Sequence, residues 1–136
     1  NRELKPFLVE TMPYPDFPTD LQAIFTTLAC AIKGRSDIKE NIYPDRFSNV
    51  PELIRMGADI TEEESSIIIR GGKKLSGADV QASDLRAGAA LVAAGAIAEG
   101  ITNVHRIYHI ERGYENLEYK LNKINIKTKK EKDDIL

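Results

Sequence analysis

The chain has a single cysteine, Cys30, among its 136 residues. One cysteine excludes a disulfide within the chain and is typical of a reducing compartment, so we expect a cytoplasmic location. Because Cys30 lies in an apolar stretch, it is predicted to be a buried, unreactive thiol. The sequence begins at Asn1 with neither an initiator methionine nor a signal peptide, which predicts a fragment or a processed form.

Long apolar runs and a surplus of either charge are also lacking. Even the most apolar stretch, 87–98, contains glycines and is followed by Glu99, so no membrane span is expected. Nineteen basic and twenty-one acidic residues give a net charge of -2, which favours neither nucleic acid nor an anionic membrane as a partner. Any phosphate must therefore be bound by individual arginines. A content of 42% hydrophobic and 29% charged residues predicts one compact domain over 1–126, followed by a polar tail over 127–136.

Prolines and glycines divide the chain into short predicted elements. Three prolines stiffen the loop 12–18, and a helix is expected from Thr19, because Thr19 and Gln22 have the spacing of a capping box. In the first half we predict a strand at 6–11, helices at 19–32 and 49–56, a strand at 38–42 and a hairpin joining 59–60 to 67–69. In the second half we predict an extended piece near Val80, a helix at 83–98, a strand at 102–107, a turn at 109–113 and a helix at 114–122.

An internal repeat organises these elements. Three pairs of identical residues are each separated by 66 positions: Gly34 and Gly100, Arg46 and Arg112, Glu52 and Glu118. The chain therefore predicts two tandem α/β units, at about 19–71 and 83–126. The helix at 83–98 is apolar on every side, which predicts that it is buried all round. The expected fold class is α/β (α+β), with the two long helices inside and the sheets outside.

Several motifs together resemble a known family. The sequence is similar to the C-terminal part of the UDP-N-acetylglucosamine enolpyruvyl transferases of bacterial peptidoglycan synthesis, with motifs in family order from about Met12 to Glu118. These motifs are PYPDFPTDLQA at 13–23, DRF at 45–47, VPEL at 50–53, KLSG at 74–77, SDLRA at 83–87 and RIYHIERGYE at 106–115. Departures from the family pattern are Pro44-Asp45, Gly88, His105, Glu111 and the segment 122–126.

The resemblance implies an activity and a set of site residues. The family transfers the enolpyruvyl group of phosphoenolpyruvate to the 3-hydroxyl of UDP-N-acetylglucosamine, in a cytoplasmic reaction that needs no metal or other cofactor. It implies that Asp20 is the base that contacts the sugar nucleotide, and that Ile42 and Tyr43 also lie against that substrate. The residues expected to face phosphoenolpyruvate are Arg46, Arg86 and Arg112, and Arg112 also counts as catalytic.

Simpler interpretations remain open for several of these residues. Asp20 and Asp84 each stand at a helix start, where the helix dipole alone favours a carboxylate. An arginine in a turn is usually solvated. His105 and His109 lack the spacing of a metal site, and we interpret them as structural or surface residues.

The function also has alternatives at this point. The family's N-terminal half is not in these residues, so the chain is expected to hold one wall of a cleft and to be inactive alone. That missing half is the expected partner, and self-association through the face it leaves open is expected as well. The alternatives are a shikimate-3-phosphate enolpyruvyl transferase fragment and a non-catalytic module that binds nucleotide sugars.

Overall fold

The computed structural model describes residues 4–13, 15–43 and 47–131, and its first unit is a β-α-β arrangement. Strand β1 (Leu8–Glu10) is followed by a short 3-10 helix, η1 (Thr19–Leu21), and by helix α1 (Gln22–Ala31). The chain then returns in β2 (Gly34–Lys39), which pairs with β1 in parallel. Parallel neighbours need a crossover, and α1 supplies it.

The rest of the first unit completes a four-stranded sheet in the order β1-β2-β4-β3. Helix α2 (Val50–Arg55) carries Pro51 in its first turn and is followed by the hairpin of β3 (Asp59–Glu63) and β4 (Ser66–Gly71). Strand β4 lies antiparallel to both β2 and β3. The β-branched Ile67 and Ile69 point from β4 into the core and are fully buried.

The second unit repeats the β-α-β pattern. Strand β5 (Asp79–Gln81), helix α3 (Leu85–Ile97) and strand β6 (Asn103–His105) form a parallel pair with a helical crossover. Two short helices follow, α4 (Tyr108–Glu111) and α5 (Leu117–Lys123). The repeat is therefore confirmed for the crossover, whereas nothing in the described part of the second unit corresponds to β3 and β4.

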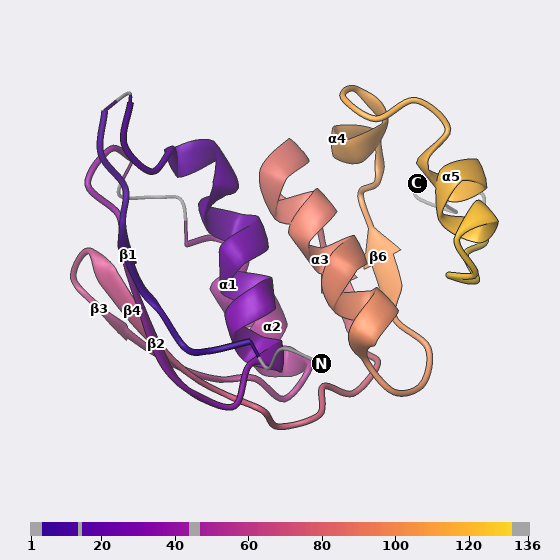
Figure 1. The fold of residues 1–136 in the computed structure, drawn as a ribbon. Helices are drawn as coiled ribbons and strands as arrows, with labels where there is room; N and C mark the ends of the chain where they lie inside the picture. The colour runs from indigo at the N-terminus through magenta and orange to yellow at the C-terminus, as the bar shows by residue number, and fades with distance from the viewer. Residues whose placement is uncertain (1–3, 14, 44–46, 132–136) are drawn as a thin grey trace.

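The two long helices lie side by side, with their N-terminal ends at the same end of the molecule (Figure 1). Thr27 of α1 donates a hydrogen bond to the carbonyl oxygen of Ala90 in α3, at 3.0 Å. The core lies between these helices, α2 and the four-stranded sheet, and its fully buried side chains include Ile38, Leu53, Met56 and Leu91. No helix in the described ranges is long and apolar enough to cross a membrane.

Two predicted elements were wrong in position or type. The strand expected at 38–42 is β2 at 34–39, because the β-bridge partners of β4 run from Gly34 to Lys39 and the chain leaves the sheet at Glu40. Gly34 opens β2, and its φ is +119°. The turn expected at 109–113 contains α4, because Ile110 packs as a buried side chain against α3.

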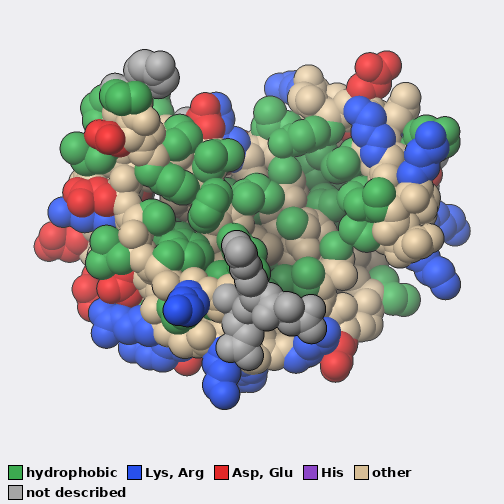
Figure 2. Space-filling model, in the orientation of Figure 1, with side chains coloured by type: hydrophobic (Ala, Val, Ile, Leu, Met, Phe, Trp, Pro, Cys, Tyr) green, Lys and Arg blue, Asp and Glu red, His purple; other side chains and the backbone are tan. Residues whose placement is uncertain are grey.

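Helix α3 is not buried all round, contrary to the sequence prediction. Ala87, Ala90, Leu91 and Ala94 are buried, whereas Ile97 is 40% exposed. On α1, Ile24 is 38% exposed. Figure 2 shows hydrophobic side chains gathered over the middle of the molecule, where Figure 1 shows α1 and α3. The helices thus cover one side of the sheet and leave an apolar face open, because no described segment packs over them.

Candidate active site

Asp20 lies in the η1 turn that leads directly into α1. The predicted capping box is absent: Pro18 occupies the N-cap position, and no side chain there accepts a cap hydrogen bond. Thr19 Oγ1 instead donates to Glu40 Oε1 at 2.7 Å, and Gln22 Nε2 donates to the same oxygen at 3.4 Å. Both capping side chains are therefore held by one carboxylate from a distant part of the sequence, and the first turn tightens into a 3-10 helix.

Arg86 lies at the second position of α3, next to the helix start. Asp84 is the N-cap of this helix, with its carboxylate accepting the Ala87 N–H at 2.9 Å, so the helix-start interpretation of Asp84 is confirmed. Arg86 Nε donates to Asp20 Oδ1 at 2.7 Å. This ion pair joins the N-terminal ends of α1 and α3, one from each repeat unit.

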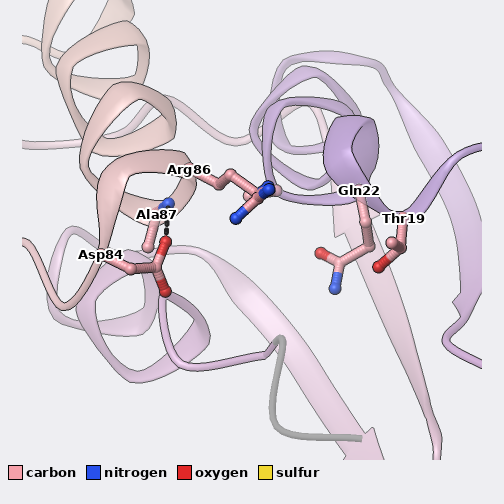
Figure 3. A pocket seen from close by; sticks show the side chains of 6 residues that line it. Thr19, Gln22, Asp84, Arg86 and Ala87 are labelled. Atoms are coloured by element: carbon pink, nitrogen blue, oxygen red, sulfur yellow. Dashed lines mark hydrogen bonds between the residues drawn. The ribbon is translucent and has the colours of Figure 1, made fainter. Parts of the chain in front are cut away.

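A small pocket of about 10 Å³, room for about one water molecule, separates these helix ends. Its lining residues come from η1, α1 and α3 and are Thr19, Gln22, Ala23, Asp84, Arg86 and Ala87. Figure 3 shows the Arg86 side chain reaching from α3 toward α1, with Asp84 turned back onto its own helix. The space-filling surface is notched at this end of the molecule (Figure 2).

Arg112 is brought to the same end by the packing of α4 on α3. Gly88 of α3 and Gly113 permit this contact: a Cβ at Gly88 would lie 2.6 Å from Ile110 Cγ1, and one at Gly113 would lie 2.6 Å from Leu85 Cδ2. Arg112 follows α4 directly, is exposed, and makes no ion pair or hydrogen bond with its side chain in the described part of the chain. Its guanidinium is therefore available to an anion.

Ile42 and Tyr43 lie in the loop that follows β2. Both of their backbone N–H groups donate to Glu40 Oε2, at 3.0 Å for Ile42 and 3.2 Å for Tyr43. The Ile42 carbonyl oxygen accepts no hydrogen bond from the described residues. The Tyr43 side chain is 51% exposed. Arg46, the remaining predicted site residue, lies outside the described residues.

Glu40 is the site residue that sequence analysis missed. Its side chain is 1% exposed. Burial alone raises the pKa of this carboxyl, but hydrogen bonds from Thr11, Thr19, Ile42 and Tyr43 outweigh it and hold the pKa below its ordinary value. A signal was present, because alternation in the strand predicted at 38–42 puts Glu40 on the same face as Ile38 and Ile42.

Other candidate groups remain outside the site. Cys30 is buried, and burial raises its pKa to about 11, which agrees with the predicted unreactive thiol. His105 lies 3.4 Å from Asp79 on the exposed β5–β6 pair, and His109 packs against the Tyr108 ring. In the described ranges no three histidine, cysteine or acidic side chains are grouped as a metal site would require.

Known proteins were compared with the chain. The family model described as EPSP synthase (3-phosphoshikimate 1-carboxyvinyltransferase) matches residues 1–121. A UDP-N-acetylglucosamine 1-carboxyvinyltransferase from Elusimicrobium minutum is 55% identical over 120 residues, covering 88% of this chain and 28% of the relative. A UDP-N-acetylglucosamine 1-carboxyvinyltransferase from Aeromonas hydrophila is also 55% identical, and the match covers 88% of this chain and 29% of that relative. The chain thus spans less than a third of the length of these relatives.

Solved structures agree on the fold. The enolpyruvyl transferase NikO from Streptomyces tendae matches with a TM-score of 0.81 and 29% identity, covering 90% of this chain and 28% of that one. An EPSP synthase from Acinetobacter baumannii matches with a TM-score of 0.78 at 18% identity, covering 96% of this chain and 32% of that one, and supports the fold alone. With a family model that matches nearly its whole length, this chain belongs to the EPSP synthase (3-phosphoshikimate 1-carboxyvinyltransferase) family.

Proposed function

We propose that the chain is part of an enzyme that transfers the enolpyruvyl group of phosphoenolpyruvate to the 3-hydroxyl of UDP-N-acetylglucosamine. In this reaction the sugar oxygen adds to C2 of phosphoenolpyruvate while C3 takes a proton. The resulting tetrahedral intermediate then loses phosphate and the C3 proton, which restores the vinyl group. The observation that carries the proposal is the Asp20–Arg86 ion pair, which places a carboxylate against the guanidinium that lines the pocket.

The ion pair suits a site that changes partners when substrate binds. Its side chains are 40% and 62% exposed, and exposed pairs of this kind contribute roughly 0–1 kcal/mol. A charge-assisted hydrogen bond to a substrate phosphate or carboxylate contributes about 1.5–3 kcal/mol. An anionic substrate therefore competes successfully for Arg86. Asp20, released from Arg86, then accepts the proton of the sugar hydroxyl, a step that contributes typically 10²–10⁴-fold.

The other site residues complete this wall in the proposal. Arg112 binds phosphoenolpyruvate beside Arg86, because the packing of α4 on α3 brings both to one end of the fold. Arg46 is proposed to bind the same substrate. The Ile42 carbonyl oxygen accepts a hydrogen bond from the sugar nucleotide, and the Tyr43 ring lies beside it. The N-terminal part of such an enzyme supplies the opposite wall, so the 136-residue chain alone is expected to release no phosphate.

A shikimate-3-phosphate acceptor is the second candidate, favoured by the family model's description. The relatives at 55% identity favour the sugar nucleotide. We propose the bacterial cytoplasm as the location, because both of the sugar nucleotide relatives compared above are bacterial and a single cysteine is typical of a reducing compartment. A non-catalytic module that binds nucleotide sugars would keep affinity without turnover.

A chimera tests the function. The matching C-terminal segment of the Elusimicrobium minutum relative is replaced by the 120 matched residues of this chain, and phosphate release is measured. We expect release that requires phosphoenolpyruvate and UDP-N-acetylglucosamine together, and none with shikimate-3-phosphate. Release with shikimate-3-phosphate would identify the other acceptor. A folded chimera that binds UDP-N-acetylglucosamine but turns over neither acceptor would contradict the proposal.

A further inference from the structure

Glu40 is a buried carboxylate whose hydrogen-bond donors come from three separate segments. Its two oxygens divide the donors between them. Oε1 accepts from the helix start, Thr19 Oγ1 at 2.7 Å and Gln22 Nε2 at 3.4 Å, and Oε2 accepts from Thr11 Oγ1 at 2.6 Å and from the N–H groups of Ile42 at 3.0 Å and Tyr43 at 3.2 Å. The Glu40 backbone is itself fixed, because its N–H donates to the Ser65 carbonyl oxygen at 2.8 Å.

This carboxylate joins the two segments that carry the proposed substrate contacts. Asp20 directly follows Thr19, which donates to Oε1, and the Ile42–Tyr43 loop is bound to Oε2. We propose that Glu40 is a positioning residue, which fixes the turn of Asp20 relative to the Ile42–Tyr43 loop and so aligns the base with the acceptor hydroxyl. The proposal rests on the proposed function for its catalytic consequence, but the positioning itself is a property of this chain.

Both oxygens of Glu40 act as acceptors in this arrangement. Burying a carboxylate is costly unless it is hydrogen-bonded, and here each oxygen receives at least two donors. In Glu40→Gln one oxygen becomes an NH₂ group. The N–H groups of Ile42 and Tyr43 cannot reverse their polarity, so the amide oxygen must stay on their side. The NH₂ group then faces Thr19 Oγ1 and Gln22 Nε2. The Thr19 hydroxyl can turn to accept from this group, but the helix start loses the charged oxygen to which both side chains donate.

The first measurement is amide hydrogen exchange by NMR on the 136-residue chain. The reporters are the N–H of Leu21, which donates to the Pro18 carbonyl oxygen within the Asp20 turn, and the N–H groups of Ile42 and Tyr43. In Glu40→Gln, exchange at Leu21 is expected to rise at least tenfold, with less than a threefold change at Ile42 and Tyr43. Glu40→Ala is expected to raise the exchange rates of all three amides. The matched control is Glu62→Gln on the exposed face of β3, which is expected to change none.

Exchange at all three amides that is unchanged in both Glu40 variants would overturn the positioning. If Glu40→Gln does not fold, Thr19→Val serves instead, because it removes one donor to Oε1 and leaves the buried charge in place. In Thr19→Val the tenfold rise is expected at Leu21 alone, and no change at Leu21 would overturn the proposal equally.

The second measurement separates positioning from a merely structural role. In the chimera, Glu40→Gln and Thr19→Val are expected to lower kcat at least tenfold, since small misplacements of a reacting group are costly, while KM for phosphoenolpyruvate stays within threefold. Thr19→Ser keeps the hydroxyl and is expected to recover most of the kcat lost in Thr19→Val. Unchanged kcat per folded molecule in both variants would refute the catalytic consequence. If the unsubstituted chimera is inactive, the proposed function fails, and the exchange rates still decide the positioning.

Discussion

Gly88→Ala tests whether the close packing of α4 on α3 places Arg112. Replacing a helical glycine with alanine stabilises a helix by about 1 kcal/mol. The new Cβ, however, would lie 2.6 Å from Ile110 Cγ1 and 3.1 Å from Ala82 Cβ. Ile110 is only 4% exposed, so it has little room to move. Overpacking of this kind costs typically 1–3 kcal/mol, which exceeds or cancels the gain in helix propensity.

Gly95→Ala on the same helix is the matched control. Its Cβ would lie 3.1 Å from Thr102 Cβ, at a half-buried position where a shift of a few tenths of an ångström relieves the contact. In thermal unfolding followed by circular dichroism, we expect Gly88→Ala to have the lower Tm by about 4–12 °C, because overpacking of about 1–3 kcal/mol lowers Tm by roughly 4 °C per kcal/mol for a chain of this size. In the chimera, Gly88→Ala is also expected to raise KM for phosphoenolpyruvate several-fold. A Tm for Gly88→Ala equal to or above that of Gly95→Ala would refute the reasoning.

Three further predictions follow from burial and exposure. Because the pKa of Glu40 is lowered on folding, its contribution to stability is full above the ordinary pKa of 4.5 and is lost as the pH falls through the folded pKa. Urea unfolding measured from pH 7 to pH 3 should show this loss of stability. A Glu40→Gln chain that loses as much unfolding free energy over the same pH range would contradict the prediction. Cys30 should react with a thiol reagent at least 100-fold faster in urea than in buffer, and equal rates would contradict its burial. The open α1–α3 face should drive self-association at high concentration, so monomers alone in light scattering would count against it, and Ile24→Lys should reduce it.

The sequence predicted elements whose signals are local. The hairpin of β3 and β4 follows from β-branched residues on either side of a polar turn, and α2 lies within the helix predicted at 49–56. Helix α3 follows from its apolar run and its Asp84 start. An α/β repeat was predicted from paired residues 66 positions apart, and both units contain a long helix followed by a strand.

The missed features depend on contacts between distant residues. The capping box at Thr19 and Gln22 had the correct spacing, but Glu40 attracts both side chains from 18 or more positions away. The strand containing Ile38 was predicted to start four residues too late and to end three residues too late, because its pairing with β4 rather than its own alternation sets its bounds. The exposure of α3 depends on which segments pack over it. An apolar pattern in the sequence indicates that the helix should be covered, but it does not indicate by which segment.

The pairing of Asp20 with Arg86 was not predicted as a contact, although both residues were predicted site residues. They are brought together because α1 and α3 pack side by side with their N-terminal ends at one end of the fold (Figure 1). The resemblance to a known family identified Asp20 and Arg86 as site residues, and the internal repeat explains why they lie in contact. Each unit contributes one helix start, and the pocket forms between the two.

The most direct test of the account is the kcat of the chimera carrying Asp20→Asn beside one carrying Asp84→Asn. If Asp20 is the base, its substitution lowers kcat by about 10²–10⁴-fold. Asp84→Asn should keep kcat within a few-fold, because asparagine also serves as an N-cap and the Asp84 carboxylate accepts the Ala87 N–H of its own helix. Equal kcat values for Asp20→Asn and the unsubstituted chimera would contradict the central claim.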